Sequence, residues 1–423
     1  MSKGAMRTTV SGERRTEAGD GSEAQASAPG SQPWPGPLSS GPCPLLGVVA
    51  DDLTGAVDTG VQFARAGLET LVLLEPDTSL AAQVIVVTTD SRDEKPSEAY
   101  RRARDATRLL GGRFVYKKID STLRGNVGAE MDGLMDGLEI GRALVAPAFP
   151  ATGRTTSGGI HMVNGIPLAE SSFAHDPVWP ARQSHLPTML AGQTRRAVGY
   201  LSLDVVERGP RAVAEALASE PSPVIASDAV EARHLATLAI AMARSSERWL
   251  PCGSAGLAEE IPAAFGVAAR QGRFQWPADP RPALVVAGSR HSSTAGQLRR
   301  AAANGDVVLV EMAPEEENHE ARDRVDRSLR EGRCVAIATT FSEYKQGRGK
   351  EAAEWLAAES AKVVLKDAVS GVFLTGGDVA RAFCRALGAP ALRALGEVQA
   401  GVAIAALAGG KRDGLRVVTK AGG

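Results

Sequence analysis

The sequence has no excess of charge of either sign, since 48 Lys and Arg residues stand against 49 Asp and Glu residues. A field strong enough to attract nucleic acid or an anionic membrane is therefore not expected, and any anion has to be bound locally. None of the four cysteines belongs to a CxxC pair, which excludes a cysteine-based zinc site and suits a reducing cytoplasm. No apolar run approaches the roughly 18 residues that span a bilayer, so we expect no membrane segment.

Other signals are also missing. The chain has no GxxxxGK(S/T) motif, which excludes a P-loop as the route to phosphate binding. The non-periodic region 158–187 contains His161, His175 and His185 without the i, i+4 spacing of metal ligands, so we predict no metal site there but a compact loop over the ligand crevice. Residues 1–44 lack the apolar core of a signal peptide and are rich in Gly, Ser, Pro and Ala, which predicts a disordered tail.

From residue 45 onwards, short apolar runs alternate with segments of helical periodicity, which predicts a largely parallel sheet. A length of 423 residues with 43% hydrophobic content favours two or three domains with sizeable cores. Residues 271–282 are poor in apolar side chains and contain three prolines, which indicates a linker. We therefore predict two α/β domains with mainly parallel sheets and a ligand cleft between them, at 45–270 and 283–423.

The densest group of polar residues lies in KKIDSTLRGNVGAE, residues 117–130. A strand-like run precedes it and apolar residues at helical spacing follow it, so it connects a strand to a helix. Ligands collect at the carboxyl ends of such strands, and Arg124 could bind a carboxylate or phosphate bidentately beside Lys118. A helix cap by Asp120 and Ser121 would explain only part of the set. The set is Lys118, Asp120, Ser121, Thr122, Arg124 and Asn126.

Two acids and two more arginines follow other predicted strands. Asp51 and Asp52 end a buried strand, where adjacent carboxylates are unfavourable unless a cation or a hydroxyl-rich ligand lies near. A helix N-cap by Asp52 or Thr54 is the structural alternative. Arg92 follows a later strand and Arg154 lies in a Gly- and Pro-containing loop, so both are candidates for binding an anion.

Glycine-containing turns follow the strands predicted in the C-terminal domain. Residues 288–294 place small and hydroxyl side chains between a strand and a helix, which suits a nucleotide phosphate or ribose. Gly376 and Gly377 would let the backbone approach a phosphate closely, although a turn that only needs positive φ would also use them. Residues 420–423, a lysine followed by small residues, are compatible with phosphate as well.

Together these motifs resemble the four-carbon acid sugar kinase family, formerly a domain of unknown function. The matching segments, in family order, are VVADDLTGAVDTGVQFARAGLET, KKIDSTLRGNVGAE, APAFPATGRTT, VNGIPLAES, VVAGSRHSSTAGQ, LTGGDVARA and VVTKAGG. The resemblance implies a sugar-acid-binding N-terminal domain and an ATP-binding C-terminal domain. The residues it implies for the sugar acid are Asp51, Asp52, Arg92, Lys118, Asp120, Ser121, Thr122 and Arg124. Those it implies for the nucleotide are Ser289, Gly376, Gly377, Asp378, Val379 and Gly422.

The resemblance further implies ATP-dependent phosphorylation of the terminal hydroxyl of threonate, erythronate or 3-oxo-tetronate. Mg²⁺ is expected to bridge the ATP phosphates, and either Asp51 or Asp120 would accept the hydroxyl proton. Two alternatives stay open. Residues 51–54 resemble the DxDxT signature of aspartyl phosphatases apart from its spacing. A non-catalytic sugar-acid-binding protein with a degenerate nucleotide site is the other, because residues 378–380 depart from the family's usual pattern. The sequence also leaves a homo-oligomer open.

Overall fold

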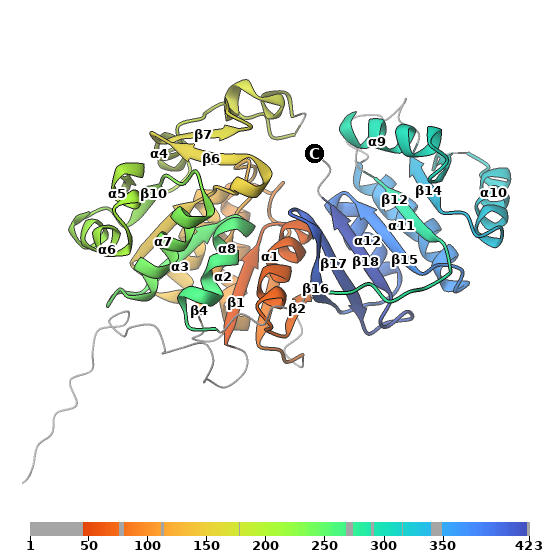
Figure 1. Cartoon of the computed structure of the whole chain (residues 1–423), viewed down its shortest axis with the longest axis horizontal. Helices are drawn as coiled ribbons and strands as arrows, with labels where there is room; N and C mark the ends of the chain where they lie inside the picture. The colour runs from red at the N-terminus through yellow and green to blue at the C-terminus, as the bar shows by residue number, and fades with distance from the viewer. Residues whose placement is uncertain are drawn as a thin grey trace, which may run out of the picture.

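The described part of the chain alternates strands with helices (Figure 1). The computed structural model describes residues 45–75, 80–110, 114–176, 178–267, 274–288, 292–314, 316–339 and 349–420. The N-terminal half contains β1 (Leu46–Ala50), α1 (Leu53–Arg65), β2 (Thr70–Leu73), β3 (Val84–Thr88), α2 (Pro96–Leu110), β4 (Phe114–Lys118), α3 (Val127–Leu138), β5 (Arg142–Ala146), β6 (Arg154–Ser157), β7 (Ile160–Val163), β8 (Ile166–Pro167), α4 (Leu186–Ala191), β9 (Val198–Leu201), α5 (Leu203–Glu207), α6 (Pro210–Ser219), β10 (Val224–Ser227), α7 (Ala232–Ala243), β11 (Trp249–Gly253) and α8 (Ala255–Ala264). The C-terminal half contains β12 (Ala283–Ala287), α9 (Ser292–Ala303), β13 (Val308–Met312), α10 (His319–Arg330), β14 (Val335–Thr339), α11 (Gly349–Leu365), β15 (Gly371–Thr375), α12 (Gly377–Ala386), β16 (Ala391–Gln399), β17 (Val402–Ala408) and β18 (Arg416–Lys420).

Among these residues, one sheet of 15 strands runs through both halves. Its order is β13-β14-β12-β15-β18-β17-β16-β2-β3-β1-β4-β11-β5-β10-β9. Most neighbours are parallel, and the antiparallel pairs are β2 with β16, β16 with β17 and β17 with β18. The prediction of a mainly parallel α/β fold is therefore confirmed.

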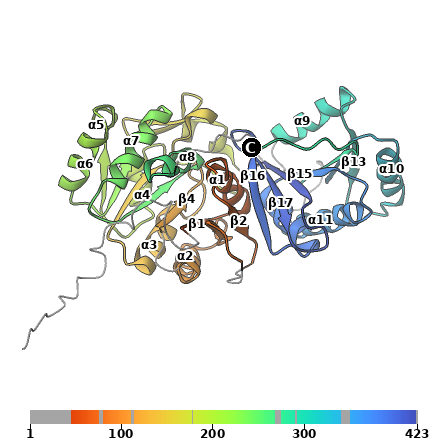
Figure 2. The same cartoon turned by 60° about the horizontal axis from the view of Figure 1, so that its bottom comes forward.

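The two halves meet where β16 pairs with β2. Leu392 of β16 lies opposite Val72 of β2 in an antiparallel register, and the two strands lie side by side in both views (Figures 1 and 2). The predicted domains are thus joined by backbone hydrogen bonds as well as by the intervening chain. Residues 274–282, the described part of the predicted linker, contain neither helix nor strand. The domain boundaries themselves stay a prediction.

The region 158–187 is more regular than predicted. Instead of a loop, it contributes β7 and β8 to the small antiparallel sheet with β6, and it adds short 3₁₀ helices at Leu168–Glu170 and Ser172–His175. His161 and Val163 of β7 are buried while their neighbours are half-buried, which is the alternation of a strand. The loop prediction was wrong because Ile160 and Met162 are as apolar as Val163, so the residue types in this strand do not alternate although their burial does.

Helix α1 lies at the centre of the molecule, between the two halves (Figure 1). Asp52 is its N-cap and its Oδ1 accepts a hydrogen bond from the Gly55 N–H at 2.9 Å, so the predicted cap is present. Because β1, β3 and β4 are adjacent and parallel, the loops that follow them begin at the same edge of the sheet. That edge is where the predicted sugar-acid residues come together.

Candidate active site

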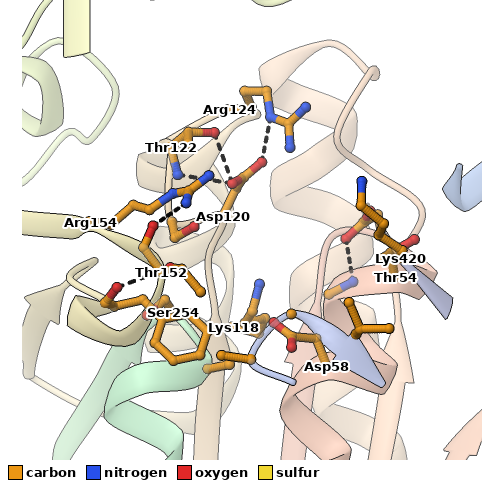
Figure 3. A pocket seen from close by; sticks show the side chains of 18 of the residues that line it. Thr54, Asp58, Lys118, Asp120, Thr122, Arg124, Thr152, Arg154, Ser254 and Lys420 are labelled. Atoms are coloured by element: carbon orange, nitrogen blue, oxygen red, sulfur yellow. Dashed lines mark hydrogen bonds and ion pairs between the residues drawn. The ribbon is translucent and has the colours of Figure 1, made fainter. Parts of the chain in front are cut away.

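A cavity of about 180 Å³ opens at this edge of the sheet (Figure 3). Residues of the turn between β16 and β17, together with Lys420, line it from the C-terminal half. Most of the predicted sugar-acid residues line it from the N-terminal half, namely Asp52, Arg92, Lys118, Asp120, Ser121, Thr122, Arg124 and Arg154. Asp51 is buried behind the lining residues, with 3% of its surface exposed.

Arg92 binds the two adjacent acids of the β1 loop. Its Nε and Nη2 donate to Asp51 at 2.7 and 3.0 Å, and its Nη1 and Nη2 donate to Asp52 at 3.0 and 2.8 Å. Although burial on its own would raise the pKa of Asp51, Arg92 and Lys117 lower it below its usual range. The cation that two neighbouring carboxylates need is therefore supplied by the protein. Arg92 is correspondingly less available to a ligand than its sequence position suggested.

Asp120 organises the loop that follows β4. Its Oδ1 accepts hydrogen bonds from the Thr122 backbone N–H at 2.9 Å and from the Thr122 hydroxyl at 3.0 Å, and its Oδ2 accepts from Arg124 Nε at 2.5 Å. Burial raises the pKa of Asp120, but Arg124, Arg92 and Lys118 together lower it well below its usual range. Asp120 is thus ionised and fixes the position of Arg124.

Two guanidinium groups have donors that no other described residue uses. Within the part of the chain that the structure describes, Arg124 makes one hydrogen bond, through Nε, and its Nη1 lies 3.8 Å from Asp176. Arg154 donates through Nη1 to the Thr152 carbonyl, while its buried Nε has no partner among the same residues. Both guanidinium carbons lie over the Phe173 ring, 5.8 and 6.0 Å from its centroid. The free edges of Arg124 and Arg154 are therefore suited to a planar anion such as a carboxylate.

His161, which the sequence analysis placed in the region over the ligand crevice without giving it a role, contacts the backbone of this loop. Its Nε2 lies 2.7 Å from the Ser121 carbonyl oxygen and must donate to it, so Nδ1 accepts from the Thr156 hydroxyl at 2.9 Å. Burial lowers the pKa of His161 to about 4, so the ring is neutral at pH 7. The small β6-β7-β8 sheet thereby fixes the position of Ser121.

The adjacent lysines of β4 point to opposite faces of the sheet, as strand geometry requires. Lys117 is buried and its Nζ lies 2.6 Å from Glu130 of α3, whose other carboxylate oxygen accepts from the Ser91 hydroxyl at 2.7 Å. Lys118 lines the cavity, where its ammonium would lie 2.9 Å from a Cβ placed on Gly55. Lys117 therefore supports the site from the core, and Lys118 faces the ligand.

Sequence reasoning also missed Asp58, which lines the cavity from α1 (Figure 3). Asp58 follows Gly55 by three residues, and Gly55 follows the N-cap Asp52 by three, so each lies beside the one before it on the helix surface. That spacing is the signal that could have identified it. Burial raises the pKa of Asp58 to about 6, with Lys118 acting in the opposite direction.

Of the predicted nucleotide residues that the structure describes, Gly376 and Gly377 form a turn beside the cavity without lining it. Gly376 has φ of 102°, a conformation that needs glycine, and its N–H donates to the Lys420 carbonyl at 3.3 Å. A Cβ on Gly377 would lie 3.3 Å from Thr54 Oγ1 and 3.4 Å from Asp52 Oδ2, so this turn contacts the N-terminal half. Asp378 and Val379 continue into α12. Ser289 and Gly422 lie outside the described residues.

No group of three or more His, Cys, Asp or Glu residues in the described part of the chain is arranged to hold a metal ion. Burial raises the pKa of Asp378, and the neighbouring acids Asp90 and Asp93 raise it further. Acids that repel one another in this way would be stabilised by a cation brought to the site.

The helices of the described residues include none long and apolar enough to cross a membrane.

The fold and the cavity define an α/β protein with a charged cavity at the carboxyl ends of parallel strands. Two family models match it, a sugar-binding N-terminal domain over residues 46–261 and a nucleotide-binding C-terminal domain over residues 284–423. The chain belongs to the four-carbon acid sugar kinase family, as its sequence motifs predicted.

Curated relatives match nearly the whole chain. It is 34% identical over 410 residues to a D-threonate kinase of Salmonella typhimurium, a match that covers 89% of this chain and 94% of that protein. It is 32% identical over 413 residues to a D-erythronate kinase of Heliobacterium modesticaldum, covering 89% and 93%. A crystal structure of a Salmonella typhimurium protein superposes with a TM-score of 0.73 at 23% identity, covering 89% of this chain and 95% of that one, which shows the shared fold.

Proposed function

We propose that this protein is an ATP-dependent kinase that phosphorylates the terminal (4-) hydroxyl of a four-carbon sugar acid such as threonate, erythronate or 3-oxo-tetronate. The observation that carries the proposal is the cavity itself. Arginines with unused donors line it from the N-terminal half, and the glycine turn that contacts Asp52 and Thr54 lies beside it in the C-terminal half. Family membership and the names of the relatives support the same reaction.

The N-terminal residues receive the following roles in this proposal. Arg124 and Arg154 bind the substrate carboxylate through their free guanidinium edges. Ser121, Thr122 and Lys118 bind the hydroxyl groups. Asp51, Asp52 and Arg92 form a hydrogen-bonded group that supports the loops of the cavity. Asp120 holds Arg124 and Thr122 in place. Catalysis of phosphoryl transfer consists mainly of such positioning and charge neutralisation.

The nucleotide would bind to the C-terminal residues Ser289, Gly376, Gly377, Asp378, Val379 and Gly422. Gly376 supports this assignment because its positive φ of 102° makes a tight glycine turn at the start of α12, beside Asp52 and Thr54 of the cavity, and the N-terminus of a helix favours phosphate. When bound, Mg²⁺ would neutralise charge on the transferred phosphate, and Asp378 is the acid of this turn that could hold it. Lys420 lines the cavity from the same side.

We further propose that the protein acts in the cytoplasm, where ATP is plentiful. Cys252, Cys334 and Cys384, the cysteines of the described residues, are unpaired, as a reducing compartment favours.

An ADP-release screen of the purified protein with Mg-ATP tests the function. The acceptors are D-threonate, L-threonate, D-erythronate, 3-oxo-tetronates and, as a three-carbon control, D-glycerate. We expect turnover with one four-carbon acid and transfer of label from the γ-phosphate to its terminal hydroxyl. Release of inorganic phosphate from a sugar phosphate without ATP would instead indicate a phosphatase. Calorimetry that detects sugar-acid binding but no ATP binding would indicate a non-catalytic binding protein.

A further inference from the structure

Asp58 has a carboxylate oxygen that is buried without a hydrogen-bond partner among the described residues. Its Oδ1 is inaccessible to solvent and has no hydrogen-bond partner, and its carboxylate makes no hydrogen bond or ion pair to any residue that the structure describes. Burying a carboxylate oxygen without a partner is unfavourable, and such groups in native proteins usually have a functional reason. The side chain lines the cavity, where a ligand can supply the missing partner (Figure 3).

The nearest cation leaves room for such a ligand. Lys118 is buried and faces the same cavity, and its positive charge opposes the effect of burial on Asp58, yet the two side chains form no ion pair. A hydroxyl group between them could donate its proton to Asp58 while its oxygen accepts a hydrogen bond from Lys118. By contrast, Arg92 and Arg124, which line the same cavity, bond their acids directly.

Asp58 also lies on the side from which the second reactant would come. Glu397 of β16 and the residues after it approach α1, and Gln399 to Val402 line the cavity opposite the Asp120 loop. Asp58 thus lies between the N-terminal loops and the C-terminal half. Asp51 and Asp120, the acids suggested by the sequence, have their oxygens bound to Arg92, Arg124 and Thr122 and are poor proton acceptors.

We propose that Asp58 is the general base of the reaction and that Lys118 binds the oxygen it deprotonates, an inference that rests on the kinase function proposed above. The terminal hydroxyl of the sugar acid gives its proton to the Asp58 carboxylate as its oxygen forms a bond to the γ-phosphorus of the nucleoside triphosphate. The bond from that phosphorus to the β,γ-bridging oxygen breaks, and its electron pair leaves with the nucleoside diphosphate. Asp58 then returns the proton to solvent.

The titration of Asp58 fits this role. Burial raises its pKa to about 6, helped by the negative charges of Glu397, Asp52 and Asp120 and opposed by Lys118. Burial raises the pKa of the Tyr116 hydroxyl, and the negative charge of Asp58 raises it further. A base with a pKa just below neutral pH is ionised when needed and still accepts a proton effectively. The rate should therefore rise with pH through about 6 and level off above it.

The decisive variant is Asp58→Asn, compared with Asp120→Asn and with Asp323→Asn, an exposed control on α10. With the best sugar acid and saturating Mg-ATP, we expect Asp58→Asn to lower kcat about 10²- to 10⁴-fold, with little change in KM for either substrate, and to lose the rise of rate with pH. Asp120→Asn should lower turnover through the misplaced Arg124 but keep that rise. Asp323→Asn should match the wild type.

A structural role for Asp58 predicts different results. Because the folded-state pKa lies above the usual value for aspartate, the ionised side chain destabilises the fold at neutral pH, so Asp58→Asn should melt no lower than the wild type. Formate should restore part of the turnover of Asp58→Ala. Turnover by Asp58→Asn within a few-fold of the wild type, or an unchanged pH profile, would overturn the assignment. If the wild type itself transfers no phosphate to any sugar acid, the proposed function fails instead, so the two failures are distinguishable.

Discussion

The N-terminal wall of the cavity consists largely of ionised side chains, whereas the C-terminal wall offers mainly backbone. On the first, Arg92 and Arg124 are fixed by hydrogen bonds to Asp51, Asp52 and Asp120. On the second, the described lining is the turn from Gln399 to Val402 together with Lys420, next to the Gly376 turn.

The difference matches what each wall would bind in a kinase of this family. A small sugar acid offers one carboxylate and a few hydroxyls, so it has to be recognised by directed, charge-assisted hydrogen bonds. A triphosphate carries many oxygens, which successive backbone N–H groups can bind without side chains. Changes to the charged N-terminal wall should therefore weaken binding of the sugar acid. Changes to the glycine turn at Gly376 and Gly377, beside the C-terminal wall, should weaken binding of the nucleotide.

The largest effect is expected beneath the charged wall, at the buried pair of Lys117 and Glu130. Lys117→Met leaves the Glu130 carboxylate buried without its cation, which should lower the free energy of unfolding by about 3–5 kcal/mol. The double variant Lys117→Met/Glu130→Leu removes both charges and should recover much of that loss. Urea unfolding of the three proteins measures it. Equal stability of single variant and wild type would show that the charged wall does not depend on this pair.

Arg124→Gln tests the charged wall itself. The variant keeps a polar side chain but removes the guanidinium group, which can donate two hydrogen bonds to one carboxylate. Hydrogen bonds to charged groups contribute about 1.5–3 kcal/mol of free energy. We expect KM for the sugar acid to rise about 10- to 100-fold while the affinity for ATP, measured by calorimetry, is unchanged. Arg101→Gln on the exposed face of α2 is the matched control. A comparable loss of ATP affinity would contradict the proposal that the N-terminal wall binds the sugar acid and not the nucleotide.

Gly377→Ala tests the glycine turn beside the C-terminal wall. The new Cβ would lie 3.3 Å from Thr54 Oγ1, tighter than most contacts, so the turn has to shift slightly, at a cost of about 1 kcal/mol. ATP affinity should fall several-fold, and KM for the sugar acid should stay the same. Gly296→Ala on α9, where a Cβ meets nothing within 4 Å, should change neither. An effect confined to the sugar acid would reverse the assignment of the walls.

The smallest effect is expected for Arg65→Gln, at the surface where the halves meet. Arg65 pairs with Glu397 at 2.6 Å and with Glu259 at 3.2 Å, but its side chain is 40% exposed. Exposed pairs contribute below about 1 kcal/mol, so we expect a small drop in Tm that disappears at high salt. A large loss of stability would mean that ion pairs, rather than the β2–β16 pairing, join the halves.

Much of the fold was predictable because its signals are local. The apolar run that Asp51 and Asp52 end predicted the strand β1, since hydrophobic spacing records which side of an element is buried. Residues 391–408 gave no such signal. They are rich in Ala and Leu and form the antiparallel strands β16 and β17, because tertiary pairing of β16 with β2 and of β17 with β18 outweighs their weak strand propensity.

The sequence by itself determined which loops carry the polar chemistry, because those loops follow runs whose local hydrophobic pattern marks them as strands. It indicated Arg124 and Lys118 correctly as lining residues of the cavity. Only the tertiary structure decided how these charges are used. Arg92 is bound by Asp51 and Asp52, some 40 positions away, and Asp58 Oδ1 is buried with no hydrogen-bond partner among the described residues. Electrostatic pairing depends on distances between segments remote in sequence, which only the packed sheet defines.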